Sequence, residues 1–275
     1  RPTTPYTRTV IPTATTARMM ARDTNASSAT SLSEMTMISA DRMKSVRTAP
    51  DTMVFSSGST SSAPAWESPW PLILCHGMPE LAYSWRQQFA SLVAAGFHVI
   101  APDMRGVGNS QVLPRREDYT LQARLDDMCA LLDHYGYEKG IFIGHDFGGT
   151  IVWGMGLYHQ DRVAGLCACN SPFADMPMNP LDLYNMMYGP TNYFAYFQTQ
   201  ACEDKFNEDP ARTFRFYLRR DTGQGTNLSR SRAHDAESIG HVHWIHDDES
   251  TWPGEVLLDD AELNHYADAY RKTGF

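Results

Sequence analysis

The chain has 275 residues, of which 42% are hydrophobic and 11% aromatic, and this is enough to bury the core of one large domain or of a domain with a subdomain. Its formal net charge of −9 argues against nucleic acid or an anionic membrane as a main partner, because no basic face is available to neutralise phosphates. A small neutral substrate fits better. No apolar run reaches the roughly 18 residues of a membrane span, so we expect a soluble, cytoplasmic protein.

Residues 1–55 read as an extension that precedes the folded part. They are rich in Ser, Thr, Ala and Met and show no sustained hydrophobic period, and residues 1–50 carry seven basic and three acidic side chains. Such a basic, acid-poor start is also typical of a mitochondrial transit peptide. Because the arginines form no clear amphipathic helix, we predict a disordered extension and keep mitochondrial targeting as the alternative.

From residue 56 to residue 175, buried strands alternate with amphipathic helices. The predicted strands are "PLILCHG" (71–77), "FHVIAPD" (97–103), "KGIFIGHD" (139–146) and "VAGLCACNSPF" (163–173). The predicted helices are "SWRQQFASLVAAG" (84–96), "TLQARLDDMCALLDHYG" (120–136), with Thr120 as its cap, and "GGTIVWGMGLYHQ" (148–160). This alternation predicts an α/β fold, with a mostly parallel sheet and helices on both faces.

Residues 176–275 have a different composition, rich in Tyr, Phe, Met, Asn and Pro. "DPARTFRFYLRR" (209–220) and "DDAELNHYADAYRK" (259–272) are the clearest amphipathic helices, and no strand pair of comparable strength is present. We interpret this segment as a mainly helical cap on the sheet. Five cysteines occur, an odd number without Cys-x-x-Cys spacing, and we interpret them as reduced thiols: Cys75, Cys129, Cys167, Cys169 and Cys202.

The stretch "GHDFGG", residues 144–149, has the pattern of a nucleophile elbow with Asp146 in the position where serine is commoner. Small residues around the tip allow strand and helix to approach closely, and the helix N-terminus favours an anion. A carboxylate placed there can attack an sp³ carbon and form an ester. In isolation, the pattern fits equally well an ordinary aspartate that caps the following helix.

The loop "HGMPE", residues 76–80, favours the first interpretation. It ends the first strong strand with a turn of Gly77, Met78 and Pro79 that directs backbone N–H groups, notably that of Met78, at the space above the sheet. An oxyanion hole in such folds takes one N–H from this loop and one from the residue after the nucleophile, here Phe147. We expect His76 to be a structural residue that bonds the loop.

With these motifs, the chain resembles the epoxide hydrolases of the α/β-hydrolase fold. The matching segments run in order from about Pro71 to the last residue: "HGMPE", "YSWRQQF", "DMRGVGNS", "GHDFGG", "CNSPF", the cap segment "YFAYFQ" and "ELNHYADAYRKTGF". Each motif alone is modest, but this many in the right order and spacing form a strong pattern.

The resemblance implies a set of roles. Asp146 would open the epoxide, Tyr193 would act as the acid on the departing oxygen, and the N–H groups of Phe147 and Met78 would stabilise the later oxyanion. The expected partners are a small apolar epoxide and water, without any cofactor. Aromatic cap residues suggest an apolar tunnel: Tyr184, Tyr188, Phe194 and Trp244. Tyr193 could instead serve core packing, since Tyr193 and Tyr196 lie three residues apart and can share a helix face.

Two other activities of this fold fit the sequence less well. Haloalkane dehalogenases of the same fold also use an Asp nucleophile, but they usually bind the halide with a Trp where Phe147 lacks a donor. A serine esterase is excluded because no Gly-x-Ser-x-Gly follows a strand.

The segment "HVHWIH" (241–246) suggests a metal site, but alternating histidines are more often a solvated edge, so we expect no metal.

The resemblance also implies a His–acid pair and a second cap tyrosine on segments that follow the cap. The chain ends at Phe275, before those segments, so we interpret it as C-terminally truncated. We predict that this polypeptide is alkylated at Asp146 without turning over. The alternative is a non-catalytic α/β-hydrolase-like protein.

Overall fold

The computed structural model describes six parts of the chain, all within one compact unit of residues 35–275. The described ranges are 37–38, 54–56, 68–173, 178–190, 192–220 and 244–275. Most of the predicted extension over residues 1–55 lies outside them, and so does the first part of "HVHWIH".

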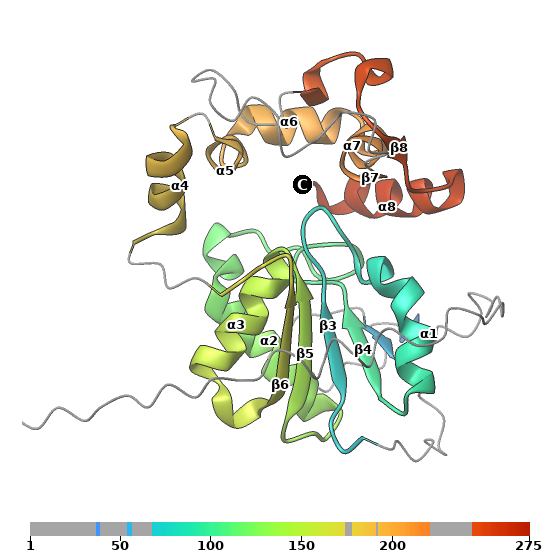
Figure 1. Cartoon of the computed structure of the whole chain (residues 1–275), viewed down its shortest axis with the longest axis vertical. Coiled ribbons are helices and arrows are strands. Elements are labelled where there is room, and N and C mark those ends of the chain that lie inside the picture. The colour runs from blue at the N-terminus through green and yellow to red at the C-terminus, as the bar shows by residue number, and fades with distance from the viewer. Residues whose placement is uncertain (1–36, 39–53, 57–67, 174–177, 191, 221–243) are drawn as a thin grey trace, which may run out of the picture. The chain divides into compact units, whose positions relative to one another are not determined.

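The described residues form a six-stranded sheet in the order β1-β2-β4-β3-β5-β6 (Figure 1). The four strands predicted from the sequence are confirmed, and they run parallel to one another. They are β3 (Leu72–Cys75), β4 (Val99–Pro102), β5 (Gly140–His145) and β6 (Val163–Cys169). Their carboxyl ends therefore lie at one edge of the sheet.

Two further strands fall in the region that we predicted as an extension. β1 (Met37–Ile38) pairs antiparallel with β2 (Val54–Ser56), and β2 pairs antiparallel with β4. Strands of two and three residues are too short to show a hydrophobic period, so the sequence carries no signal for them. The sheet thus includes residues that sequence analysis placed outside the fold.

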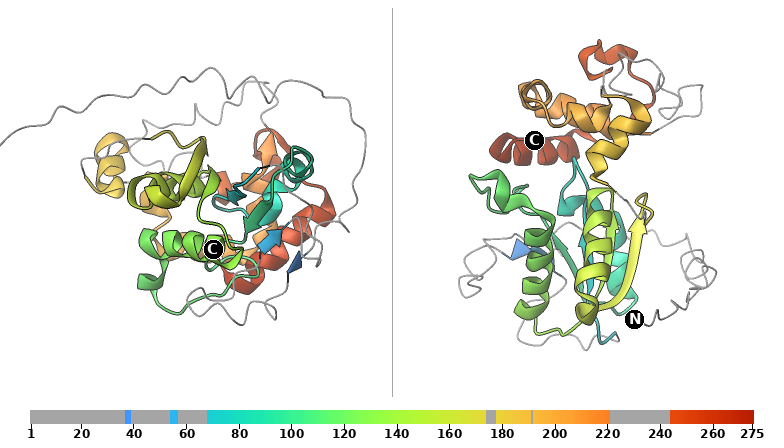
Figure 2. Two further views of the ribbon diagram at one scale, coloured as in Figure 1. Left: turned by 90° about the horizontal axis from the view of Figure 1, so that it is seen from below. Right: turned by 90° about the vertical axis from the view of Figure 1, so that its left-hand side faces the viewer.

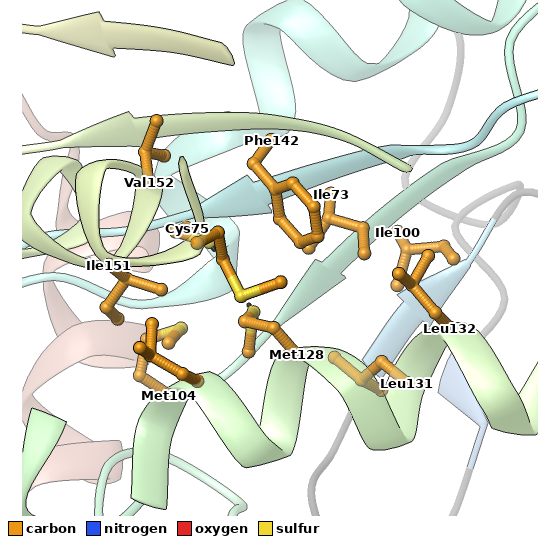
Figure 3. Packing of buried hydrophobic residues seen from close by; sticks show 12 residues of the cluster. Ile73, Cys75, Ile100, Met104, Met128, Leu131, Leu132, Phe142, Ile151 and Val152 are labelled. Carbon is orange, nitrogen blue, oxygen red and sulfur yellow. Dashed lines mark hydrogen bonds between the residues drawn. The ribbon is translucent and has the colours of Figure 1, made fainter. Parts of the chain in front are cut away.

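Helices cover both faces of the sheet, as predicted (Figure 2). The helices are α1 (Arg86–Ala94), α2 (Leu121–His134) and α3 (Phe147–Tyr158). Successive residues of β3 point to opposite faces of the sheet: Leu74 packs with Phe89 of α1, whereas Ile73 packs with α2 and α3. Figure 3 shows the hydrophobic cluster that contains Ile73, in which Phe142 lies among side chains of α2 and α3.

Helix ends follow ordinary capping chemistry. The Thr120 hydroxyl accepts from the N–H of Ala123 at 3.3 Å, as expected for the start of α2, and Gly96 and Gly136 after α1 and α2 have positive φ angles of 85° and 74°. These local signals explain why the sequence places the helices so well.

The cap contains five helices among its described residues. They are α4 (Pro180–Tyr188), α5 (Tyr193–Tyr196), α6 (Gln200–Glu208), α7 (Pro210–Tyr217) and α8 (Asp260–Thr273). A small antiparallel pair joins β7 (Arg219–Arg220) to β8 (Glu255–Val256), which the sequence did not indicate because each strand has only two residues. Figure 1 shows these helices beyond the carboxyl ends of the sheet strands.

The cap is anchored to the core through α8. Phe214 of α7 is fully buried against Tyr266 and Tyr270 of α8, and the same cluster includes Leu81 and Tyr83 from the loop after β3. The Tyr270 hydroxyl donates to the carbonyl of Glu80 at 3.0 Å and accepts from its N–H at 3.1 Å. The loop that carries "HGMPE" is therefore held from above by a cap helix.

Candidate active site

Asp146 stands at a sharp turn between β5 and α3. Its backbone has φ 54° and ψ −120°, a positive φ that non-glycine residues adopt rarely and that is typical of a strained functional turn. Although Asp146 occupies the N-cap position of α3, its side chain makes no capping hydrogen bond. The alternative interpretation, an ordinary helix cap, therefore does not match the geometry.

Two glycines make this turn possible by close backbone approach. A Cβ on Gly144 would lie 2.2 Å from the carbonyl oxygen of Gly148, and a Cβ on Gly148 would lie 2.1 Å from that of Cys75. Real Cβ atoms do not approach backbone so closely. The small residues of "GHDFGG" thus bring α3 against β5 and β3.

The "HGMPE" loop meets the aspartate directly. The backbone N–H of Met78 donates to Asp146 Oδ1 at 3.1 Å. Gly77 lies so near that a Cβ there would be 2.5 Å from the Cβ of Asp146, and the peptide bond between Met78 and Pro79 is cis. The residues that we predicted as motif support thus place one N–H donor on the carboxylate.

The backbone N–H of Phe147 is the second predicted donor. Phe147 is the first residue of α3, where N–H groups have no partner inside the helix, and its side chain is 36% exposed. The dipole of α3 adds partial positive charge at the same place. The elbow therefore offers an anion a positively polarised surface.

His76 holds the loop from beneath. Its Nε2 accepts from the N–H of Met104 at 2.9 Å, so Nδ1 carries the proton and donates to the carbonyl of Gly77 at 2.8 Å. Burial lowers the pKa of His76 against the raising effect of Asp103. A neutral, fully engaged imidazole of this kind positions the loop.

The sequence analysis gave no role to a pair that flanks the elbow, Glu80 and His145. Glu80 Oε1 contacts His145 Nδ1 at 2.9 Å, and Glu80 Oε2 accepts from the N–H of Gly77 at 2.7 Å. The hydrogen bond that His145 donates to the Glu80 carboxylate raises the pKa of His145. Burial opposes ionisation of Glu80, but the bonds from His145 and Gly77 prevail and lower its pKa. This pair ties the loop to the residue before Asp146.

Ser171 supports the turn from the next strand. Its hydroxyl donates to the carbonyl of Asp146 at 2.8 Å, and a Cβ on Gly149 would lie 2.4 Å from the Ser171 Cβ. The preceding residue, Asn170, has a positive φ of 57°. The "CNSPF" segment thus buttresses the elbow, a contact that only the parallel pairing of β5 and β6 creates.

Tyr193 lies at the start of α5, which the Asn192 side chain caps by accepting from the N–H of Ala195 at 3.1 Å. Its ring packs against Phe194 and Phe197, with centroids 4.4 Å and 5.6 Å away. It belongs to the aromatic cluster of the cap that contains Cys202, Phe206, Phe216, Ile245 and Trp252.

Tyr217 at the end of α7 packs against this cluster. Its ring meets Phe206 edge-on at 5.6 Å, and its buried hydroxyl has no hydrogen-bond partner among the residues that the structure describes. Burial raises the pKa of Tyr217 well above its ordinary value, and Cys202, Tyr193 and Asp146 add to the effect. No sequence motif marks this residue.

A pocket of about 330 Å³ is lined in part by Met78, the residue of the "HGMPE" loop whose N–H contacts Asp146. Met78 is 42% exposed. The remaining wall comes from the turn η5 (Arg116–Tyr119), from the cap and from Phe275. Of the aromatic residues predicted to form a tunnel, Tyr184 and Phe194 contact each other within the cap, with ring centroids 4.0 Å apart and ring planes tilted by 48°.

Two absences hold for the described residues only. None of their helices is long and apolar enough to cross a membrane. No group of three or more of their His, Cys, Asp and Glu side chains is arranged to hold a metal ion.

Comparison with known proteins shows what the chain is similar to. Residues 71–259 match the family model of the alpha/beta hydrolase fold. Over 209 residues the chain is 35% identical to epoxide hydrolase A of Mycobacterium tuberculosis, a match that covers 74% of this chain and 63% of that protein. It is 33% identical to bifunctional epoxide hydrolase 2 of Mus musculus over 208 residues, which is 36% of that protein. The chain thus spans less than two thirds of either relative.

Solved structures agree with this pattern. The crystal structure of epoxide hydrolase A from Mycobacterium thermoresistibile superposes with a TM-score of 0.68 and 31% identity, covering 88% of this chain and 71% of that one. Epoxide hydrolase VrEH1 from Vigna radiata gives a TM-score of 0.65 at 22% identity, which shows the shared fold alone.

Proposed function

Because the chain belongs to the α/β-hydrolase fold family and is similar to epoxide hydrolases, we propose that it opens an epoxide with Asp146 on the way to a vicinal diol. One observation carries this proposal: a carboxylate, where the fold commonly has a serine, stands on a positive-φ turn and accepts the N–H of Met78 rather than capping its own helix.

In the first step, a carboxylate oxygen of Asp146 attacks a ring carbon of the epoxide. The carbon–oxygen bond of the ring breaks, its electron pair goes to the ring oxygen, and that oxygen takes a proton from the phenol of Tyr193. An acid is required because an alkoxide is a poor leaving group at neutral pH. The product of this step is a hydroxyalkyl ester of Asp146.

In the second step, water adds to the carbonyl carbon of the ester. The oxyanion that forms would lie against the N–H groups of Met78 and Phe147, the first of which already contacts Oδ1. Collapse of the adduct breaks the acyl–oxygen bond and restores the carboxylate of Asp146. One proton of the water goes to the departing alkoxide, which leaves as the diol, and the other returns to the Tyr193 phenolate. Among the described residues, His76 and His145 are engaged with the loop, so we assign the base for this step to neither of them.

Haloalkane dehalogenation is the second candidate, since it begins with the same ester. Phe147 argues against it because a phenyl ring cannot donate a hydrogen bond to a leaving halide. The two reactions differ in their leaving group, so a direct comparison of substrates separates them.

The test is to incubate the chain with styrene oxide, or separately with a chloroalkane, and to follow intact protein mass and diol formation. We expect a mass increase of one styrene oxide per chain, or diol, and no halide release. The Asp146→Asn variant removes the nucleophile and should abolish adduct and diol.

A matched control is Asp182→Asn on the exposed first turn of α4, which should leave both signals intact. An adduct that persists in Asp146→Asn would falsify the assignment of the nucleophile. Faster reaction with the chloroalkane than with the epoxide would instead favour the dehalogenase.

A further inference from the structure

The pocket beside the elbow carries information on the substrate. It begins at Met78, whose backbone N–H contacts Asp146 and whose side chain lies on the pocket wall. A molecule that reacts with Asp146 and extends past Met78 enters this space. Its volume of about 330 Å³ is at the small end of ligand sites, which range from roughly 300 to 1,000 Å³.

One part of the wall is apolar. Phe197 and Phe206 come from the cap, where they pack together with ring centroids 6.0 Å apart, and Phe275 contacts Phe206 at 5.4 Å. These three rings line the pocket with apolar carbon, so burial of a hydrocarbon chain against them is favourable. This part accounts for an alkyl or aryl portion of the substrate.

The other part of the wall is polar and carries both signs of charge. Arg116 reaches it from the turn η5, and its Nη2 donates to the side-chain oxygen of Gln198 at 2.6 Å. Glu203 of α6 contributes a carboxylate to the same wall. Arg116 and Glu203 have opposite charges, so a carboxylate end attracted by Arg116 is repelled by Glu203, and an ammonium end attracted by Glu203 is repelled by Arg116. The wall as a whole therefore favours neither sign of charge.

An uncharged group that both donates and accepts hydrogen bonds suits this wall. A hydroxyl or a primary amide can accept from Arg116 and donate to Glu203, and hydrogen bonds to charged groups are stronger than those between neutral groups. The net charge of −9 adds a general penalty for anionic ligands.

We propose that the pocket lined by Arg116, Gln198 and Glu203 binds the far end of the substrate and selects uncharged epoxides that carry a hydroxyl or amide group there. This inference rests on the proposed function, because it takes Asp146 as the site of reaction.

The test uses four terminal epoxides with the same alkyl chain, ending in a methyl, a hydroxyl, a carboxylate or an ammonium group. The rate of Asp146 ester or diol formation is measured at low concentration for each. We expect the hydroxyl epoxide to react about tenfold faster than either charged one, and faster than the plain alkyl epoxide.

Two charge-removing variants sharpen the result. Glu203→Gln should raise the rate with the carboxylate epoxide about tenfold relative to the other three, and Arg116→Gln should do the same for the ammonium epoxide. Glu208→Gln is the matched control, because it lies on the same helix, pairs with Lys205 and is not part of the pocket wall. It should leave all four rates unchanged.

Failure of the two proposals looks different. If the four epoxides react at equal rates that all depend on Asp146, or if the carboxylate epoxide is fastest, the pocket proposal is overturned while the proposed function stands. If no epoxide reacts at Asp146, the proposed function itself is overturned, and the pocket proposal falls with it.

Discussion

The core and the cap position their functional groups by different means. In the core, Gly144 and Gly148 approach backbone so closely that no other residue fits, and the turn at Asp146 follows from these contacts. In the cap, Tyr193 and Tyr217 are held by neighbouring aromatic rings. Such packing tolerates substitution by another hydrophobic side chain of similar volume. The position of Asp146 is thus set by backbone geometry, whereas the positions of the cap tyrosines are set by side-chain packing.

The sharpest test of the core side is Gly148→Ala. The new methyl would lie 2.1 Å from the carbonyl oxygen of Cys75, a backbone atom that cannot move without displacing β3. We expect a loss of about 4 kcal/mol in the free energy of unfolding, or failure to fold, measured by urea denaturation.

The control is Gly156→Ala on the same helix. Its methyl would meet only the Cδ1 of Leu166, the end of a flexible side chain, at 2.6 Å. Because alanine also favours helix, the change should stay within about 1 kcal/mol. Equal losses in the two variants would contradict a backbone-limited elbow.

The junction of core and cap is tested by Tyr270→Phe. This removes the hydroxyl that accepts from the N–H of Glu80 and donates to its carbonyl. Both backbone groups, which lie in a half-buried loop, then lose this hydrogen-bond partner. We expect a cost of about 2–3 kcal/mol in unfolding free energy. Tyr266→Phe, which loses a single bond to the hydroxyl of Ser84, should cost less. A smaller loss at position 270 than at 266 would show that the cap does not hold the loop.

The Glu80–His145 pair predicts a pH dependence. Because the pKa of His145 is raised from about 6.5, its contribution is complete below that pH and is lost as pH rises through the raised value. Because the pKa of Glu80 is lowered from about 4.5, its contribution is complete above that pH and is lost as pH falls through the lowered value. The Glu80–His145 pair therefore contributes most to the free energy of unfolding at pH values between the lowered pKa of Glu80 and the raised pKa of His145.

The variant Glu80→Gln should therefore lose about 1 kcal/mol relative to the parent near pH 6, and the gap should narrow as pH rises past the pKa of His145. Urea midpoints across this range measure it. Glu117→Gln, on the exposed turn η5, should show no such trend. A gap that widens with rising pH would contradict the ion pair.

The smallest effect is expected for Tyr217→Phe in the cap. The hydroxyl of Tyr217 is buried without a hydrogen-bond partner among the described residues. Removing it removes the free-energy cost of desolvating a polar group that gains no hydrogen bond in return. Thermal unfolding should show no loss or a gain of up to about 1 kcal/mol. A loss comparable to that of Tyr270→Phe would mean that the hydroxyl has a partner.

The difference between local signals and long-range packing explains which features could be predicted from the sequence. Strands β3 to β6 and helices α1 to α3 were recognisable because their hydrophobic periods and caps, such as Thr120, are local signals. The contact of Met78 with Asp146 could be expected because both motifs end parallel strands. The Glu80–His145 pair spans 65 positions and Tyr217 bears no motif, so both required the packed structure.

Met78 offers a practical consequence for protein engineering. Its backbone N–H serves Asp146, and this donor is present in every residue except proline. Met78 also lines the pocket. A library of substitutions at this one position could therefore reshape the range of accepted molecules while the donor at the reactive carboxylate is retained.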